Sequence, residues 1–208
     1  MKILLIVFYI LVLLSTAFSI QDISSDNASF ASFENAVLKL KSFKNYDSNP
    51  CIIIAVALQK LFLFEDDNII AEYYISSSKY GIGSEEGSMK TPLGAHAIYK
   101  KIGSDAPIGT MFKARKQINK ISKIYTEPVS TKQDIITTRI LWLKGLEQGI
   151  NKGKNIDSKK RYIYIHGTHE EGLIGKPASK GCIRMKNKDV IELFDKAGVN
   201  TLVEIIEK

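Results

Sequence analysis

The sequence predicts a mainly β domain of sandwich or barrel type with a few short helices. Three observations support this fold class. Most apolar residues fall in short runs or alternate with polar residues, these runs are separated by short stretches of turn-forming residues, and only two segments show apolar side chains at helical spacing. Strands therefore dominate, and they must bury their apolar faces against one another.

Two helices are expected. Apolar side chains recur at helical spacing from Phe30 to Leu40, which predicts a helix over residues 30–43. A second helix is predicted to begin with Asn187 as its N-cap and to close at Gly198, because asparagine favours the first position of a helix and glycine favours the end.

The strands follow from apolar runs and from alternation. Turn-forming residues at 66–68 separate two such runs and predict a hairpin. Alternation from Arg161 to His166 places Tyr164 and His166 on one face of a strand, because side chains along a strand have a period of two. The expected strands, in chain order, cover residues 52–58, 61–64, 69–76, 95–101, 161–166 and 202–206.

The N-terminus is typical of a secretory signal peptide. Lys2 supplies a positive start, residues 3–14 are an unbroken apolar run, and small residues follow up to an expected cleavage site after Ser19. An uncleaved anchor is the alternative. We expect a signal peptide at 1–19, a helical or linker segment at 20–50, a globular domain at 51–208, and export to the periplasm or cell envelope.

Composition and charge exclude several classes of protein and of ligand. The chain has 208 residues, 45% of them apolar, and a formal charge of +7. This argues against a disordered chain, a collagen or a coiled coil. The lysines and arginine between residues 113 and 123 lack interleaved aromatic residues, so we expect a solvated face and no nucleic-acid partner. The glycines between residues 80 and 94 lack the spacing of a phosphate-binding loop.

The two cysteines differ in their surroundings. Cys51 opens an apolar run, whereas Cys182 lies near Lys180 and Arg184 in a glycine-containing turn. One structural disulfide between them is the simplest hypothesis for an exported chain. The alternative is that the positive charges near Cys182 lower its thiol pKa and make it reactive.

Residues 164–185 carry most of the candidate chemistry. The stretch holds two of the three histidines and one of the two cysteines. Cys182 and His166 suit a nucleophile and its base, because a thiol needs a proton acceptor to attack. Zinc binding by His166, His169 and Cys182 is a second possibility, although a structural zinc site wants four ligands. A purely structural loop is the third.

This stretch resembles the L,D-transpeptidase catalytic-domain family (the YkuD-type domain), whose members act on bacterial peptidoglycan. The resemblance covers roughly residues 51–208. It rests on motifs in a fixed order: Thr91-Pro92-Leu93-Gly94, Thr138-Arg139-Ile140-Leu141-Trp142-Leu143, Arg161-Tyr162-Ile163-Tyr164-Ile165-His166 with Gly167-Thr168, and Ser179-Lys180-Gly181-Cys182-Ile183-Arg184.

The resemblance implies a cysteine acyltransferase of the L,D-transpeptidase fold that needs no metal or cofactor. Cys182 would attack the bond between the third stem residue and D-alanine, and an acceptor amine would then resolve the thioester. His166 would act as the base, with its ring oriented by the carbonyl of Gly167. The N–H groups of Gly181 and Cys182 are the expected oxyanion hole.

Other residues have two possible roles each. Arg184 can hold a substrate carboxylate or form a structural ion pair. Ser179 can hydrogen-bond within the cysteine loop or serve as a plain turn residue. Tyr164 can line the substrate cleft or pack in the core. Thr91 can shape the wall of the site or take part in the reaction. Lys180 stands where the family usually has histidine, and a lysine donates hydrogen bonds but accepts none.

The expected partners are peptidoglycan stem peptides, as donor and acceptor, and carbapenem-type inhibitors, with no membrane span after cleavage. Two alternatives stay open. One is an L,D-carboxypeptidase or endopeptidase that uses the same site. The other is a wall-binding protein that has lost turnover, with Lys180 as the lesion.

Overall fold

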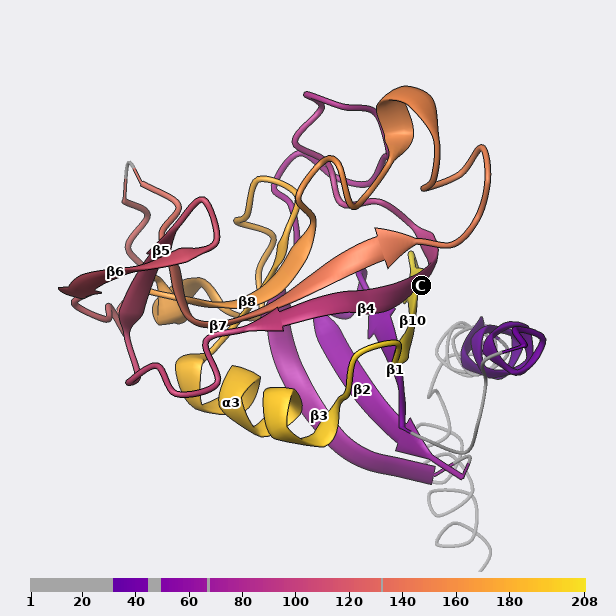
Figure 1. Cartoon of the computed structure of the whole chain (residues 1–208), viewed down its shortest axis with the longest axis horizontal. Helices are drawn as coiled ribbons and strands as arrows, with labels where there is room; N and C mark the ends of the chain where they lie inside the picture. Colours follow the sequence, from indigo (N-terminus) through magenta and orange to yellow (C-terminus); the bar gives the residue numbers. More distant parts are fainter. Residues whose placement is uncertain (1–31, 45–49, 67, 132) are drawn as a thin grey trace, which may run out of the picture. The chain divides into compact units, whose positions relative to one another are not determined.

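Ten strands form one sheet in the part of the chain that the computed structural model describes, which is residues 32–44, 50–66, 68–131 and 133–208. The order of the strands is β4-β10-β1-β2-β3-β9-β8-β7-β5-β6, and β4 also pairs with β7. This extra pairing closes eight strands into a barrel and leaves the β5–β6 hairpin outside it (Figure 1). The predicted mainly β, barrel-like fold is confirmed.

The elements have the following bounds. The strands are β1 (Cys51–Ala55), β2 (Lys60–Glu65), β3 (Asn68–Ser76), β4 (Gly94–Ile102), β5 (Thr110–Lys113), β6 (Lys116–Ile121), β7 (Ile136–Gly145), β8 (Tyr164–Thr168), β9 (Ile183–Met185) and β10 (Leu202–Ile206). The helices are α3 (Asn187–Lys196) and two short 3₁₀ turns, η1 (Lys154–Ile156) and η2 (Glu171–Leu173). Residues 32–41 are also helical.

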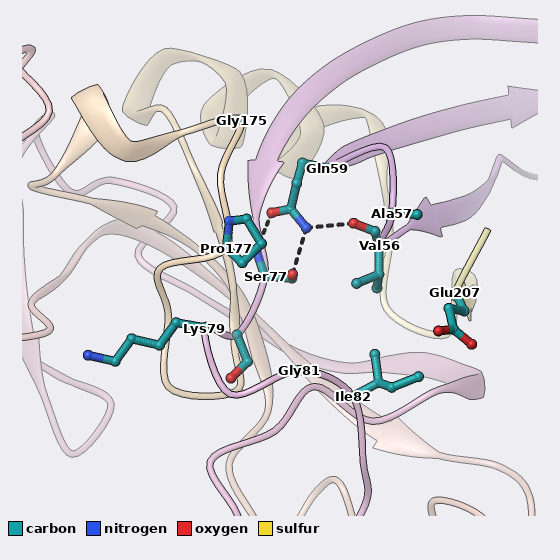
Figure 2. A pocket seen from close by; sticks show the side chains of 11 residues that line it. Val56, Ala57, Gln59, Ser77, Lys79, Gly81, Ile82, Gly175, Pro177 and Glu207 are labelled. Carbon is teal, nitrogen blue, oxygen red and sulfur yellow. Dashed lines mark hydrogen bonds between the residues drawn. The ribbon is translucent and has the colours of Figure 1, made fainter.

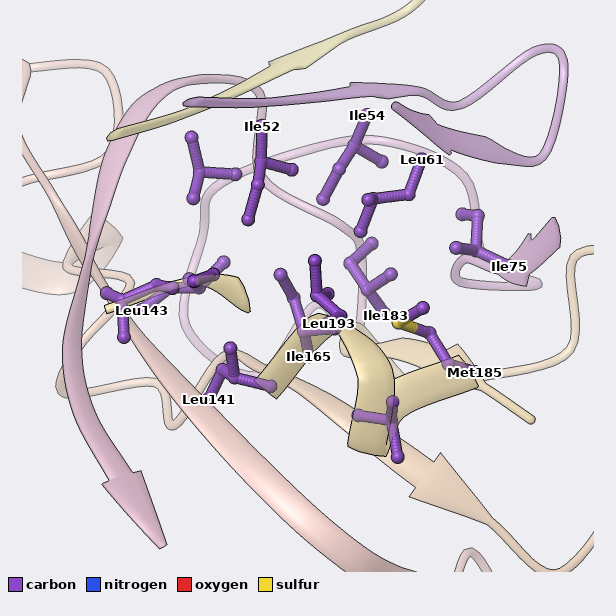
Figure 3. Packing of buried hydrophobic residues seen from close by; sticks show 14 of the residues in the cluster. Ile52, Ile54, Leu61, Ile75, Leu141, Leu143, Ile165, Ile183, Met185 and Leu193 are labelled. Carbon is purple, nitrogen blue, oxygen red and sulfur yellow. The ribbon is translucent and has the colours of Figure 1, made fainter. Parts of the chain in front are cut away.

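The hydrophobic core lies inside the barrel. Figure 3 shows side chains of β1, β2, β3, β7, β8 and β9 converging on one cluster, with Leu193 of α3 among them. The helix packs against β7 and β8, and its apolar residues Val190, Leu193 and Phe194 are buried. Because β8 and β9 contribute Ile165 and Ile183 to this core, the residues that follow and precede them are held in place.

The chain divides into two compact units, residues 1–35 and 36–208. Within the second unit, Lys39 binds Glu147 at 2.9 Å and the buried Glu204 of β10 at 2.8 Å. The predicted signal peptide at 1–19 lies outside the described residues, and the predicted boundary at residue 50 stays a prediction. No helix among the described residues is both long and apolar enough to cross a membrane.

Several element boundaries differ from the prediction. β1 ends at Ala55 because residues 56–59 form a turn in which Gln59 has a φ of 51°. β8 begins at Tyr164 because the backbone turns at Tyr162, where φ is 57°. The N-cap of α3 is Lys186, and the buried Asn187 is its first helical residue. The helix ends at Lys196 with Ala197 as its C-cap, and the predicted Gly198 is the next residue.

The β5–β6 hairpin was missed entirely. Its strands lie in a segment that the sequence analysis treated as irregular and charged. The turn between them is Ala114-Arg115, and both residues have a positive φ, of 48° and 66°. Two-residue hairpin turns usually carry glycine or asparagine at such positions, so this turn has no recognisable signature. The hairpin pairs with β7 through β5 (Figure 1).

Candidate active site

The loop that carries Cys182 is fixed by its own side chains and by its neighbours. Ser179 is buried, and its hydroxyl donates to the carbonyl of Cys182 at 2.6 Å and accepts the N–H of Gly181 at 3.2 Å. The hydroxyl of Thr91 donates to the carbonyl of Gly181 at 3.1 Å. These contacts fix Cys182 one residue before β9. They place Ser179 and Thr91 as supports of the loop, and leave their predicted substrate contacts as predictions.

Gly181 is required by its backbone. Its φ is +117°, a conformation that side chains rarely adopt, and a Cβ there would lie 3.3 Å from the carbonyl oxygen of Lys90. The predicted oxyanion donors are the N–H groups of Gly181 and Cys182. Since the Gly181 N–H already donates to the Ser179 hydroxyl, that donor is engaged in the resting structure.

His166 lies on the strand next to the one that follows Cys182. β8 and β9 are parallel, and His166 pairs with Arg184, so Cys182 lies two residues before that partner, directly ahead of the neighbouring strand. The imidazole is buried, and its Nδ1 lies 2.8 Å from the carbonyl oxygen of Gly167. This contact assigns the proton to Nδ1 and leaves a lone pair on Nε2. It is the contact that the predicted role of Gly167 requires.

Burial sets the protonation of both groups. It lowers the pKa of His166, although Asp134 and the Gly167 carbonyl oppose the shift, so the ring is neutral at pH 7. Burial also raises the pKa of the Cys182 thiol to about 12. The thiol donates to the carbonyl of Tyr162, with Sγ 3.4 Å from the oxygen. The resting pair is therefore a thiol and a neutral imidazole.

The predicted lowering of the Cys182 pKa is wrong for this resting state. Burial outweighs the charges near Cys182, although Arg184 and Arg161 both act to lower the thiol pKa. Lys180 is exposed, and Arg184 is buried in an ion pair. The Cys51–Cys182 disulfide, the simpler of the two hypotheses, is not formed: Cys51 is buried in β1, and Cys182 is partly exposed at the loop.

Arg184 points into the protein. Its guanidinium donates to Glu170 at 2.8 Å and lies 2.7 Å from Asp134, and its side chain is 3% exposed. Glu170 also accepts the backbone N–H of Thr131, whose hydroxyl contacts Nε2 of the buried His169 at 2.8 Å. This geometry matches the structural ion pair. It engages Arg184 with two carboxylates in the interior, and the substrate-binding role of this residue stays a prediction.

Asn187 explains why residue 167 is glycine. Its side chain accepts the hydroxyls of Thr137 and Thr138 and donates to the carbonyl of Thr168 at 2.8 Å. A Cβ on Gly167 would lie 2.7 Å from the Asn187 Oδ1 and 2.8 Å from the Thr137 carbonyl. The carbonyl that contacts His166 is thus fixed from behind by β7 and α3.

Aromatic residues form the wall beside Cys182. Tyr164, Ile140 and Phe112 belong to a small apolar cluster against which Trp142 and Cys182 pack. Trp142 contacts Tyr164 edge-on, with ring centroids 5.8 Å apart, and Tyr162 at 5.7 Å. Tyr164 was predicted at the site and is present there.

Two arginines at this wall were missed by the sequence analysis. Arg161 donates to the carbonyls of Gly83 and Lys90, at 3.2 and 2.7 Å, and so fixes the 83–90 loop beside the cysteine loop. Arg115 reaches the wall from the β5–β6 turn and donates to the hydroxyl of Tyr164 at 3.3 Å. Neither contact has a sequence signal, because each joins segments that are distant along the chain.

The zinc hypothesis finds no ligand cluster. His169 is turned toward Thr131, and within the described residues no group of three His, Cys, Asp or Glu side chains converges. The third histidine, His96, is buried between the carbonyl of Gly94 and the hydroxyl of Ser158. The predicted need for no metal stays a prediction.

A pocket of about 480 Å³ lies behind the cysteine loop. None of the predicted catalytic residues lines it. Figure 2 shows Gln59 in its wall, donating to the carbonyl of Val56 and the hydroxyl of Ser77. Ser78, also in the wall, donates its N–H to the hydroxyl of Thr91, and is bridged to Ser179. The pocket therefore shares a wall with the loop that carries the thiol.

A family model decides the family. The model of the L,D-transpeptidase catalytic domain, YkuD, matches residues 49–205. The chain belongs to this family. The match covers the barrel, the cysteine loop and His166, and it confirms the resemblance seen in the sequence.

Relatives of the L,D-transpeptidase family match over short segments. The YkuD protein of Bacillus subtilis, which is named as a putative L,D-transpeptidase, is 65% identical over 34 residues, or 16% of this chain and 21% of that protein. The ErfK/SrfK protein of Escherichia coli, named as a probable L,D-transpeptidase, is 46% identical over 48 residues, or 23% and 16% of the two chains. The matches thus span about a fifth of the length of these relatives.

Solved structures of L,D-transpeptidases are similar at low identity. One from Xylanimonas cellulosilytica is 18% identical and covers 78% of this chain and 62% of its own, with a TM-score of 0.45. L,D-transpeptidase 3 from Mycobacterium tuberculosis, in complex with a faropenem-derived adduct, is 12% identical over 76% and 61% of the two chains, with a TM-score of 0.45.

Proposed function

We propose that this protein is a peptidoglycan L,D-transpeptidase with Cys182 as its nucleophile. One observation carries the proposal. In a chain of the L,D-transpeptidase family, the Cys182 loop leads into β9, His166 lies on the adjacent parallel strand β8, and the imidazole keeps a lone pair on Nε2 because Nδ1 is bound to the Gly167 carbonyl. This is the arrangement of an activated nucleophile with an oriented base.

The first half-reaction acylates the thiol. As Sγ attacks the carbonyl carbon between the third stem residue and the terminal D-alanine, Nε2 of His166 takes the thiol proton. The C–N bond breaks, the imidazolium returns the proton to the leaving amine, and a thioester on Cys182 remains. An acceptor amine then attacks the thioester, His166 takes its proton, and the thiol is restored.

Because the pKa of the Cys182 thiol is raised, the thiol needs His166 to accept its proton. With its pKa raised to about 12 by burial, the Cys182 thiol is almost entirely protonated at pH 7. Proton transfer to His166 must therefore accompany the attack rather than precede it. The neutral state of the imidazole, which burial maintains, keeps it ready to accept that proton.

Location and inhibition follow from the same proposal. Residues 1–19 act as a signal peptide, and the enzyme works in the periplasm or cell envelope, where stem peptides occur. Carbapenem-type inhibitors acylate Cys182, because their strained carbonyl is attacked as the stem carbonyl is. Water as the acceptor would make the enzyme a carboxypeptidase.

The test compares three purified full-length proteins: the wild type, Cys182→Ala, and Cys51→Ala as a matched cysteine control. Each is incubated with a tetrapeptide-stem muropeptide, and the products are read by mass spectrometry. We expect a dimer that has lost one terminal D-alanine from the wild type and from Cys51→Ala, and none from Cys182→Ala. A tripeptide without dimer would indicate a carboxypeptidase. No product, where a control enzyme forms dimer, would refute catalysis and favour a wall-binding protein.

A further inference from the structure

Arg115 is held against the aromatic wall of the site. It lies in the turn of the β5–β6 hairpin, where its φ is 66°. The centre of its guanidinium is 4.4 Å from the ring centroid of Tyr162 and 5.0 Å from that of Trp142. Contacts of this kind stabilise a cation on a ring face. With the 3.3 Å hydrogen bond to the Tyr164 hydroxyl, three side chains fix one guanidinium.

The same aromatic residues contact the nucleophile. The Cys182 thiol donates to the carbonyl of Tyr162, and Cys182 packs with Trp142 and Tyr164 in one cluster. Arg115 is thus one side-chain layer from the thiol. The charge of Arg115 also acts on Tyr164, whose hydroxyl interacts electrostatically with both Arg115 and Cys182.

Within the described part of the chain, no carboxylate compensates the charge of Arg115. A guanidinium has five N–H donors, and those of Arg115 that are engaged meet the neutral hydroxyls of Tyr164 and Tyr162. Among residues 32–44, 50–66, 68–131 and 133–208, no Asp or Glu forms an ion pair with it. Arg184, by contrast, binds two carboxylates. Arg115 is also only partly buried, so a ligand can reach it.

We propose that Arg115 binds the carboxylate of the residue that leaves in the acylation step. The inference rests on the proposed function. The scissile nitrogen belongs to the terminal D-alanine, and its carboxylate follows after a single carbon. When a stem is placed for attack by Cys182, this carboxylate therefore lies close to the scissile bond. Its separation from that bond is comparable to the thickness of the one side-chain layer between Arg115 and the thiol. Paired N–H donors of a guanidinium match the two oxygens of a carboxylate.

This assignment makes Arg115 a specificity residue for the donor. It selects stems that end in a free carboxylate at position four. It has no such role in the second half-reaction, because the leaving residue has then departed. Loss of Arg115 should therefore lower acylation and leave the resolution of a preformed acyl-enzyme unchanged.

The experiment uses two donors, a tetrapeptide stem that ends in D-alanine and the same stem that ends in D-alaninamide. The full-length proteins are the wild type, Arg115→Ala, Arg115→Lys, and Lys113→Ala as a matched control from the same hairpin. Acylation is followed as release of D-alanine or D-alaninamide, and thermal unfolding confirms that each variant is folded. Because a hydrogen-bonded charge pair is worth about 10- to 100-fold in binding, we expect the wild type to prefer the acid by that factor in kcat/KM.

The expected pattern is specific to the acid. Arg115→Ala should lose the preference by slowing the acid alone, Arg115→Lys should keep part of it, and Lys113→Ala should keep all of it. Equal losses on both donors would overturn the proposal and make Arg115 a structural residue. Turnover without discrimination by the wild type would overturn it too. No turnover of either donor would refute the proposed function itself, which is a distinct result.

Discussion

Replacing Arg184 by methionine should destabilise the protein strongly and leave donor recognition intact. Methionine keeps much of the volume of the side chain and removes the charge. It leaves the carboxylate of Glu170, whose side chain is 2% exposed, without its cationic partner. It also removes the partner of Asp134, whose side chain is 20% exposed.

The magnitude follows from burial. Removing one member of a buried ion pair costs about 3–5 kcal/mol, because an uncompensated charge stays in the interior. Glu170 retains the N–H of Thr131, so the lower part of this range is expected. For a domain of this size, each kcal/mol lost from the free energy of unfolding lowers the midpoint of thermal unfolding by about 2–4 °C. A loss of about 3 kcal/mol should therefore lower that midpoint by about 6–12 °C.

Urea denaturation of the wild type, Arg184→Met, Glu170→Gln and the double variant measures the effect. The double variant removes both buried charges, so it should be more stable than the sum of the single losses predicts. Lys188→Ala, an exposed position on α3, serves as the control and should change the free energy of unfolding by no more than about 0.5 kcal/mol.

The competing role makes the opposite prediction. If Arg184 held a substrate carboxylate, Arg184→Met would raise KM at least tenfold and leave the free energy of unfolding within about 1 kcal/mol of the wild type. That result would show that the ion pair with Glu170 and Asp134 is not the task of this side chain, and the reasoning from burial would fail.

Two further predictions concern the site. The rate of Cys182 alkylation by iodoacetamide should rise about tenfold for each pH unit from 7 to 10, because the thiolate is the reactive form and burial raises the thiol pKa to about 12; a plateau below pH 8 would contradict this, and Cys182→Ala gives the background from Cys51. Gly167→Ala should cost about 1–3 kcal/mol in unfolding free energy and lower kcat, because the added Cβ would lie 2.7 Å from Oδ1 of Asn187 and displace the carbonyl that orients His166. Unchanged stability and turnover in that variant would show that the neighbours of Gly167 yield easily.

The parts of the fold that sequence could predict are those set by local pattern. β2, β4 and β10 lie close to the predicted ranges, because their apolar runs have no competing backbone signal. The cysteine loop and His166 were found because their residue types are rare and sit in an ordered motif. Tertiary contacts decided the remainder. Tyr162 and Arg115 have positive φ values, and neither residue type predicts such a backbone conformation.

The site shows the same division between local and distant information. Ser179 supports the cysteine loop through contacts within three residues, which a motif can encode. Arg184 depends on Asp134 and Glu170, and Gly167 depends on Asn187 and Thr137. Those partners come from other strands and loops. The sequence therefore identifies Arg184 and Gly167 as candidates but does not determine their roles.

The two arginines show why a charge near the nucleophile in sequence is a poor guide to its electrostatics. Arg184 is two residues from Cys182, yet two carboxylates compensate its charge and burial still raises the thiol pKa. Arg115 is 67 positions away and reaches the wall of Cys182 through a hairpin with no turn signature. Its partners are rings and a hydroxyl, which hold a cation without neutralising it. Folding thus compensates the charge of the arginine near the thiol in sequence and brings an arginine from a distant segment to the wall of the site. Burial keeps the thiol protonated at rest, and the charge of Arg115 remains available for the proposed substrate carboxylate.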